Sequence, residues 1–388
     1  MDAINHLIQN STIRAVVATM PARLAGLVDL AVTIQQIPAP TFAEAERAAF
    51  VQSHLVALGL TDVYQDELHN VYGRLRGQRP GTPVVISAHL DTVFAAETNL
   101  TVRRETQLVH GPGIADNSMG VAGLLILAEL LQRSGLRPQR DIWFVANVCE
   151  EGLGDLRGMR AVVERFGRDA AAYIILEGGV YGHIFHQAIA VRRYHIEITT
   201  PGGHSWGNFG TPSAIHLLGR LITTLDQIQV PDKPRTTYNV GKIEGGTTIN
   251  TIAAQASLLL DCRSEDNQAL ANLLNQVQKA IATVSNIPDV QVKITSIGDR
   301  PAGYIRLNHP LIKMTEAALR QSGCTEVFFS SGSTDANIPL SQGLPAVCIG
   351  LAQSHNAHRL DEYLDITNLS AGMVQLFLLT LAAAAFSG

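Results

Sequence analysis

A chain of 388 residues that is 46% hydrophobic and 16% charged can bury a large core, and we expect it to fold as two domains. Its formal net charge of -5 and pI of about 6.2 exclude the basic footprint of a nucleic-acid-binding protein. The four cysteines are scattered and form no CxxC pair, which argues against both a disulfide framework and a thiolate zinc site. The N-terminus lacks the pattern of a signal peptide, and the apolar stretch from Leu376 to Phe386 is too short to span a bilayer. A cytoplasmic protein that binds neither membrane nor nucleic acid is therefore expected.

Hydrophobic spacing in the first half of the chain predicts helices that alternate with buried strands. Helices are expected over 21–36 and 43–58, with Thr41 and Glu44 forming a capping box for the second. The next predicted elements are a strand at 69–75, a strand at 84–88, a helix at 117–132, a strand at 142–148, a helix at 155–166 and a strand at 172–176. Such alternation indicates an α/β domain, a mixed sheet with helices on both faces and with ligand sites at strand ends.

The pattern changes after residue 188. The predicted elements become a strand at 191–200, a helix at 213–228, strands at 236–243 and 252–262, a helix at 266–284 and a strand at 290–296. The order β-α-β-β-α-β predicts a ferredoxin-like α+β domain inserted at 189–302. The first pattern resumes with a helix at 310–322, a strand at 346–350 and a terminal helix from about 368. Residues 1–188 and 303–388 are thus expected to form one domain together.

Histidines and acidic residues stand just beyond several of the predicted strands. His89 and Asp91 end the apolar run 84–88 and, being two residues apart, point to the same side of an extended chain. The other candidates are Asp116, the pair Glu150 and Glu151, Glu177 and His358. Carboxylates that converge on one sheet edge repel each other, so this arrangement calls for a bound cation.

Two histidines and three carboxylates suit two zinc ions, or similar divalent metals, if one carboxylate bridges them. We expect Asp116 to bridge, with His89 and Glu177 on one metal and Glu151 and His358 on the other. This arrangement predicts a dinuclear metal hydrolase.

Glu150 and Asp91 are expected to assist these ligands. Neighbouring strand residues point in opposite directions, so Glu150 is predicted to act as the general base on a metal-bridging water while Glu151 binds metal. Asp91 fits as the carboxylate that orients His89.

Seven segments together resemble the M20 family of metallopeptidases and deacylases. They are residues 87–92, 113–122, 149–152, 176–178, 202–205, 332–337 and 357–363. The resemblance implies two zinc ions (cobalt or manganese in some members), a zinc-peptidase-like catalytic domain and an inserted lid domain that forms a homodimer. It implies the same metal and base residues, a cis peptide between Asp116 and Asn117, and His358 rather than His355 as the ligand.

The resemblance also implies residues that contact the substrate. His204 of the lid would reach the active site of the partner subunit and help to polarise the scissile carbonyl. The remaining predicted substrate residues are Asn250, Arg263, Gly332, Ser333 and Asp335. Without the resemblance, these positions read as a turn histidine, a strand-end asparagine, a surface arginine and a loop that caps a helix.

The expected reaction is hydrolysis of amide bonds in short peptides, and an N-acyl-amino-acid deacylase is the alternative because it cleaves the same bond. A serine hydrolase is a weaker alternative. Ser205 lies in a G-x-S-x-G pattern, and Asp335 and His358 follow it in the order of a catalytic triad. The glycines before Ser205 and the gap before the next predicted helix do not fit a strand-to-helix nucleophile elbow. A metal-binding protein without activity is a third alternative, but it would give Glu150 no chemical role.

Overall fold

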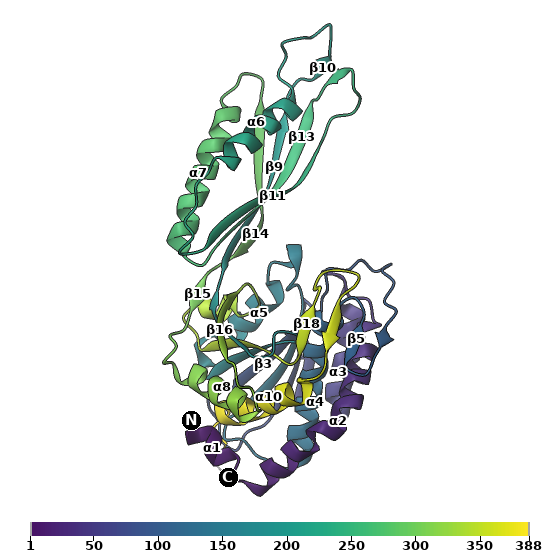
Figure 1. Ribbon diagram of the computed structural model, residues 1–388, viewed down its shortest axis with the longest axis vertical. Coiled ribbons are helices and arrows are strands. Elements are labelled where there is room, and N and C mark those ends of the chain that lie inside the picture. Colours follow the sequence, from purple (N-terminus) through teal and green to yellow (C-terminus); the bar gives the residue numbers. More distant parts are fainter. Residues whose placement is uncertain (1, 387–388) are drawn as a thin grey trace. The chain divides into compact units, whose positions relative to one another are not determined.

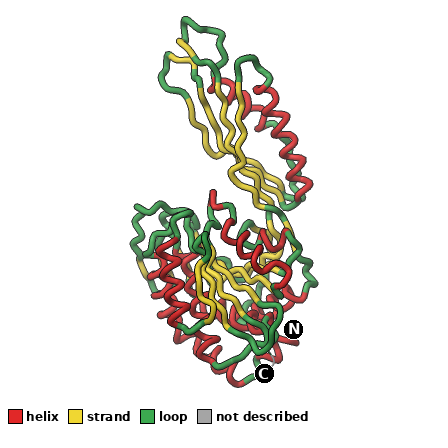
Figure 2. Tube along the Cα trace, turned by 180° about the vertical axis from the view of Figure 1, so that it is seen from behind, coloured by secondary structure: helices red, strands yellow, loops and turns green. Residues whose placement is uncertain are grey.

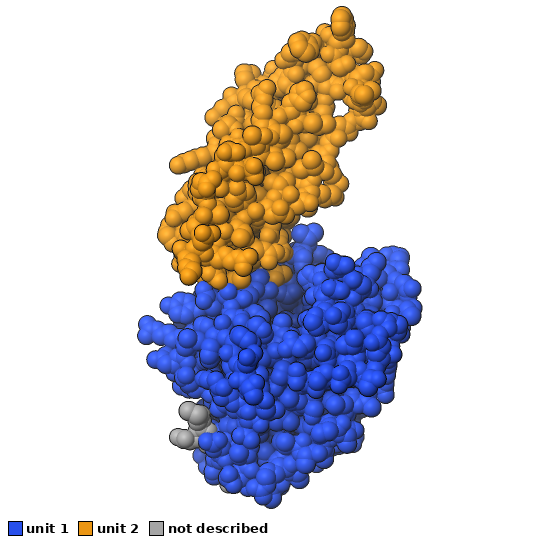
Figure 3. All heavy atoms as spheres, viewed as in Figure 1, with its two compact units in different colours: residues 1–188, 303–388 blue, residues 189–302 orange. Residues whose placement is uncertain are grey.

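The computed structural model describes residues 2–386 and divides the chain into two compact units (Figure 3). Unit 1 comprises the residues up to Ala188 together with those from Gly303 onwards, and unit 2 comprises Ile189–Ala302. Each unit has a hydrophobic core of its own.

Unit 1 is built around a mixed nine-stranded sheet (Figure 1). In spatial order its strands are β1 (Thr61–Gln65), β2 (Val71–Leu75), β6 (Ile142–Asn147), β3 (Val84–His89), β7 (Ala172–Glu177), β17 (Ala346–Gly350), β8 (His183–Ala188) and β15 (Gly303–Tyr304), with β16 (Phe328–Gly332) also paired to β8. The four central strands β6, β3, β7 and β17 are parallel. Their carboxyl ends therefore meet at one edge of the sheet, where α/β proteins bind ligands.

Helices cover both faces of this sheet, as its sequence predicts. Every residue of β3 and β6 is buried, and successive residues point to opposite faces. Helix α4 (Met119–Ser134) packs on β3, β6 and β7, whereas α5 (Arg157–Phe166) packs on β6 through the Phe166–Trp143 ring contact. The other helices of the unit are α1 (Asp2–Leu7), α2 (Ser11–Gln35), α3 (Ala45–Ala57), α8 (Pro310–Gln321), α9 (Asn337–Ser341) and α10 (Leu369–Ala383). Figure 2 shows the strands of this unit among the helices.

Two local predictions near the N-terminus are wrong. The first long helix begins at Ser11 rather than at residue 21, because Asn10 caps it and Pro21 lies on its exposed side, where the helix continues past it. Thr41 and Glu44 form no capping box for α3, since the N-cap residue is Glu44 and its side chain makes no capping hydrogen bond. Both side chains bind distant parts of the chain instead: Thr41 donates to Asp91, and Glu44 accepts from the backbone N–H of Cys149.

A small antiparallel sheet joins two segments that lie far apart in the sequence. Its order is β18 (Gln353–His355), β19 (Tyr363–Asp365), β5 (Leu108–His110) and β4 (Arg103–Arg104). Pairing of β19 with β5 places the loop that carries His358 beside the turn that carries Asp116. This long-range pairing could not be predicted from local patterns.

Among residues 2–386, two helical stretches are long and apolar enough to cross a membrane by length and composition alone. Of the apolar window in Ile114–Ser134, 83% is buried inside unit 1, which identifies it as a core helix. In Ser11–Gln35 that share is 22%, because only one face of the helix packs on the unit.

Unit 2 has the predicted ferredoxin-like order of elements. Its strands β9 (Ala190–Thr199), β11 (Thr236–Gly245), β13 (Gln255–Ser264) and β14 (Gln291–Arg300) form an antiparallel sheet in the order β11-β13-β9-β14. Helices α6 (Ala214–Asp226) and α7 (Asn267–Ser285) pack on the face that carries Ile196, Leu258 and Leu260. A short ribbon of β10 (Gly203–His204) and β12 (Thr251–Ile252) extends from this core.

Candidate metal centre

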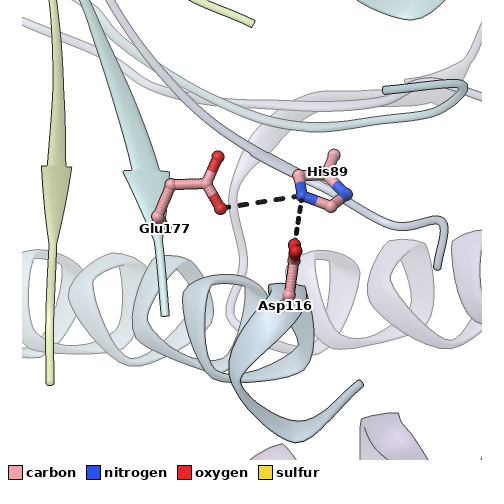
Figure 4. Close-up of side chains that lie close together, drawn as sticks. All are labelled: His89, Asp116 and Glu177. Carbon is pink, nitrogen blue, oxygen red and sulfur yellow. Dashed lines mark ion pairs between the residues drawn. The ribbon is translucent and has the colours of Figure 1, made fainter. Parts of the chain in front are cut away.

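The first half of the centre lies where β3 and β7 end. His89 and Glu177 are the last residues of these neighbouring parallel strands, so their side chains reach the same sheet edge. Asp116 approaches them from an irregular turn, Ile114–Ser118, that leads into α4. The Nε2 atom of His89 is 3.1 Å from Oδ1 of Asp116 and 3.7 Å from Oε2 of Glu177 (Figure 4). These three side chains point toward one another and can share one cation.

The second half uses the other oxygen of Asp116. Oδ2 of Asp116 is 3.0 Å from Nε2 of His358, which is 3.1 Å from Oε1 of Glu151. The donor atoms within each half lie within 4.8 Å of one another. The structure thus brings all five predicted ligands together, and Asp116 offers one oxygen to each half. His355, the alternative ligand, stacks on the Tyr363 ring instead.

The two halves differ in exposure. The His89 side chain is 2% exposed, whereas that of His358 is 53% exposed and lies on the open loop 356–361. His358 also adopts a left-handed backbone conformation, with φ of 66°. The sheet therefore holds the half that contains His89 and Glu177. The position of His358 in the other half depends on the contacts that fix the loop 356–361.

Asp91 was expected to orient His89 through its carboxylate, but its closest contact with His89 is through its backbone oxygen. The Nδ1 atom of His89 is 3.0 Å from the backbone oxygen of Asp91 and 3.5 Å from its carboxylate. The carboxylate itself accepts the backbone N–H groups of Glu150 at 2.9 Å and Glu151 at 2.8 Å, and the Thr41 hydroxyl at 2.9 Å. Asp91 thus orients His89 largely through its main chain, while its carboxylate fixes the segment that carries Glu150 and Glu151.

The electrostatics of the centre fit a bound cation. Burial, followed by the charge of Asp116, raises the pKa of Glu151 to about 8, and burial raises the pKa of Glu177 to about 7. Hydrogen bonds to Asp116 and Glu151 raise the pKa of His358 to about 10. In the absence of metal these groups retain protons that relieve the repulsion between carboxylates. Imidazole and carboxylate donors in these numbers suit zinc or a similar divalent ion, which would take the place of those protons.

Glu150 and Asp335 lie beside these ligands. Glu150 is 6% exposed, and one of its oxygens lies within 4.8 Å of donor atoms of His89 and Glu151. Asp335 is fully buried, and its Oδ2 accepts from the side-chain amide of Asn147 at 2.7 Å. The predicted substrate contact of Asp335 stays a prediction. Gly332, at the end of β16, and Ser333 are half-buried.

The remaining predicted residues belong to unit 2. His204 lies in the β10–β12 ribbon opposite Thr251, and the N–H of Ser205 donates to the backbone oxygen of Asn250. The structure thus brings His204 and Asn250 near each other on an exposed part of unit 2. Arg263, on β13, pairs with Asp261 at 2.6 Å. The roles of His204, Asn250 and Arg263 stay predictions.

The serine alternative finds no support at Ser205. This serine lies in an exposed turn after the two-residue strand β10, and α6 begins only at Ala214. Nδ1 of the neighbouring His204 accepts the backbone N–H groups of Trp206 and Gly207. A nucleophile elbow needs a strand and a helix that meet at the serine, and this segment has neither arrangement.

Sequence reasoning missed three residues that support the ligands. Asn117 follows the cis peptide that the resemblance implied after Asp116. Its side-chain amide donates to the backbone oxygen of Leu176 at 2.8 Å and accepts the N–H of Gly178 at 2.9 Å, so it grips the chain on both sides of Glu177. Gly120 leaves room for it, because an added Cβ would lie 2.0 Å from the Asn117 oxygen.

The other two missed residues are Arg47 and Glu362. Arg47 is buried and donates to the backbone oxygen of Leu90 at 2.7 Å and to that of Ile37, and burial lowers its pKa to about 10. One feature of the sequence could have indicated this role. Arg47 is a charged residue on the same face of the helix as Val51 and Leu55, which pack into the core. Glu362 binds the turn that carries Asp116, and its only mark in the sequence was its place in the matching segment 357–363.

An α/β sheet whose carboxyl edge carries two histidines and a shared carboxylate, with further buried acids around them, defines a metal-dependent hydrolase. The sequence model of the family described as "Peptidase family M20/M25/M40" matches residues 85–381. The chain therefore belongs to this family.

Known proteins agree with this assignment. A Mycobacterium tuberculosis protein that bears the name succinyl-diaminopimelate desuccinylase DapE is 30% identical over 303 residues, which is 75% of this chain and 80% of that protein. The crystal structure of the aminopeptidase PepT from Bacillus cereus matches with a TM-score of 0.74 at 20% identity, over 92% of this chain and 98% of that one. Bacillus subtilis YXEP, described as a dinuclear metal-binding peptidase of the M20 family, matches with a TM-score of 0.68 at 15% identity, over 95% of this chain and 100% of that one. These two structural matches show that the fold is shared.

Proposed function

We propose that this protein is a dinuclear metal hydrolase that cleaves amide bonds of short peptides. The observation that carries the proposal is Asp116, whose two oxygens face His89 on one side and His358 on the other. Glu177 and Glu151 complete the two donor sets. We expect zinc, with cobalt or manganese as substitutes, because imidazole and carboxylate ligands suit these ions. Two such cations supply Lewis-acid polarisation of a carbonyl and activation of water at neutral pH.

The protein's own groups would move the protons. Glu150 removes a proton from the attacking water and returns it to the leaving amine, so that the amine departs neutral. The backbone of Glu150 is fixed for this task by the carboxylate of Asp91. His204 would stabilise the negative charge that develops on the carbonyl oxygen. Asn250, Arg263 and the loop at Gly332 and Ser333 would bind the rest of the substrate.

A second substrate class is favoured by a specific observation. The relative from M. tuberculosis, at 30% identity, bears the name of an enzyme that removes a succinyl group from an amino acid. N-acyl amino acids and short peptides both contain a scissile amide bond, so the same metal centre can cleave either class of substrate. Peptides are preferred here, as the name of the B. cereus aminopeptidase also suggests.

We further propose a cytoplasmic homodimer that forms through unit 2. Its exposed ribbon and adjoining loops carry large apolar side chains that are costly to leave in water, namely Trp206, Phe209 and Ile249. A second copy that covers them would also place His204 in an interface. Sedimentation at several concentrations tests the dimer, and a W206D/F209D variant should dissociate it.

Hydrolysis of a mixed panel of di- and tripeptides and N-acyl amino acids, before and after chelation, tests the function. Activity that a chelator abolishes and zinc or cobalt restores is expected, and the best substrate separates a peptidase from a deacylase. The matched variants are E150Q, which should keep its metal and lose turnover, and S205A, which should keep both. Activity that survives complete metal removal but falls with S205A would reject the proposal.

A further inference from the structure

The residue that determines where Asp116 points is Glu362. Glu362 immediately precedes β19, and its side chain is fully buried. Its Oε1 accepts the backbone N–H groups of Ala115 at 2.8 Å and Asp116 at 3.2 Å, and its Oε2 accepts that of Gly113 at 3.1 Å. The backbone oxygen of Glu362 also accepts the N–H of Gly111 at 2.9 Å. One residue thus binds four N–H groups of the segment 111–116.

This segment needs an outside partner because it is irregular. Gly113 is in the left-handed region with φ of 71°, and Asp116 and Asn117 have non-helical angles before α4 begins. The N–H groups of Gly113, Ala115 and Asp116 therefore point away from any regular helical or strand pairing and converge on one carboxylate. Buried N–H groups without an acceptor cost about 1–3 kcal/mol each, so the conformation of this turn depends on Glu362.

The same short loop also supplies a ligand. His358 lies four residues before Glu362, and the residues between them are exposed. The exposed part of the loop is tied internally, by Arg359 and Asn356 to the side chain of Asp361. Glu362 is the point at which this loop is anchored to the turn of Asp116. It therefore contacts the turn that carries Asp116 and adjoins the loop that carries His358, the two partners of the 3.0 Å contact.

We propose that Glu362 is a positioning residue that holds Asp116 with one oxygen toward each half of the metal centre and keeps His358 in register with it. The inference rests on the proposed dinuclear centre. It assigns Glu362 neither a metal nor a substrate contact. If Glu362 is absent, both halves should still contain their donor groups, but the carboxylate shared by them should no longer be held between them.

The variant E362Q tests this with little change in size. The amide keeps one acceptor oxygen, but its NH₂ group must face at least one of the three N–H groups, and the negative charge is lost. The matched control is D361N, the same acid-to-amide change one residue earlier, on a side chain that accepts from Asn356 and Arg359 of its own exposed loop. Circular dichroism and thermal melting establish that each variant folds.

Manganese provides a readout that does not depend on activity. Titration of metal-free protein with Mn²⁺, followed by electron paramagnetic resonance, reports free Mn²⁺ and shows whether two bound ions are exchange-coupled through a shared carboxylate. Wild type and D361N should bind two ions and give the coupled signal. E362Q should bind the ions about 10–100-fold more weakly and give signals of uncoupled Mn²⁺. A folded E362Q with wild-type affinity and coupling would overturn the inference.

A second measurement covers the case in which E362Q does not fold. In metal-free wild-type protein, hydrogen exchange followed by mass spectrometry should show slow exchange in peptides that span 111–118 and fast exchange in 356–361. Equally fast exchange in both would mean that the carboxylate does not hold the turn, and would overturn the inference. Failure of wild-type protein to bind Mn²⁺ or Zn²⁺ would reject the proposed function and this inference together, which separates it from failure of the inference alone.

Discussion

Replacement of Asp91 by asparagine should disturb the Glu151 side of the centre more than the His89 side. His89 donates to the backbone oxygen of Asp91, which the substitution leaves in place. The carboxylate, by contrast, accepts the N–H groups of Glu150 and Glu151 through different oxygens. An asparagine has one oxygen, so whichever way its amide turns, one of these N–H groups faces an NH₂ group.

The size of the effect follows from these contacts. One buried N–H without an acceptor costs about 1–3 kcal/mol, and loss of the charge weakens the remaining bonds, for a total of about 2–4 kcal/mol. At about 2 °C per kcal/mol for a unit of this size, the melting temperature of the metal-free protein should fall by about 4–8 °C. Affinity for the cation held by Glu151 and His358 should fall by about 10–100-fold.

Anomalous diffraction at the zinc edge measures the occupancy of each position separately in crystals of D91N soaked at limiting zinc. We expect the position beside His89 and Glu177 to stay occupied and the one beside Glu151 to be depleted. The control is D266A, which removes the side chain that caps α7 in unit 2 through the Ala269 N–H and should lower stability without any loss of zinc. Depletion beside His89 alone, or equal depletion of both positions, would refute the reasoning.

Three further predictions concern proton transfer, pH and thiols. E150Q should keep its zinc but lose about 10²–10⁴-fold in kcat, and wild-type kcat in this variant would remove Glu150 from the reaction. The metal-free protein should melt at lower temperature as pH rises from 6 to 10, because the pKa values of His358 (about 10) and Glu151 (about 8) lie above the unfolded values of 6.5 and 4.5. The folded state then binds more protons than the unfolded one, so stability falls with pH. Scanning calorimetry should show this slope without zinc and a weaker one with zinc, and equal slopes would contradict it. A thiol reagent at pH 8, followed by mass spectrometry, should label Cys324 first, since the other three cysteines are buried and burial raises their pKa. Early labelling of any of the three would contradict their burial.

The sequence predicted much of the fold because its elements are locally consistent. The apolar runs at 84–88, 142–148 and 172–176 became the buried parallel strands β3, β6 and β7, and the rule that ligands follow strand ends pointed to His89 and Glu177. The predicted start of the first long helix and the predicted capping box are wrong because contacts elsewhere in the fold outweigh the local sequence rules. Pro21 was tolerated on an exposed helix face, and Thr41 and Glu44 were used by partners about 50 and 105 residues away.

The supporting residues escaped prediction for a related reason. Asn117 and Glu362 act on backbone groups rather than on side chains, so no pattern of residue types marks their targets. For Glu362 the target lies almost 250 residues earlier and becomes its neighbour only through the pairing of β5 with β19. Strand order of this kind depends on the whole sheet, and the spacing of apolar residues does not encode it.

These supporting contacts explain why ligands occur beside other polar residues in the sequence. Asp91, two residues after His89, holds the backbone of Glu151. Asn117, next to Asp116, holds the chain around Glu177. Glu362, four residues after His358, holds the turn of Asp116. These contacts join the segment of His89 to that of Glu151, and the segment of Asp116 to those of Glu177 and His358. Loss of a proposed ligand removes its own donor atoms, whereas loss of a supporting residue should displace a donor that belongs to another segment. The proposed ligands thus have partners in the fold that do not depend on a bound cation, and such contacts preorganise a metal centre.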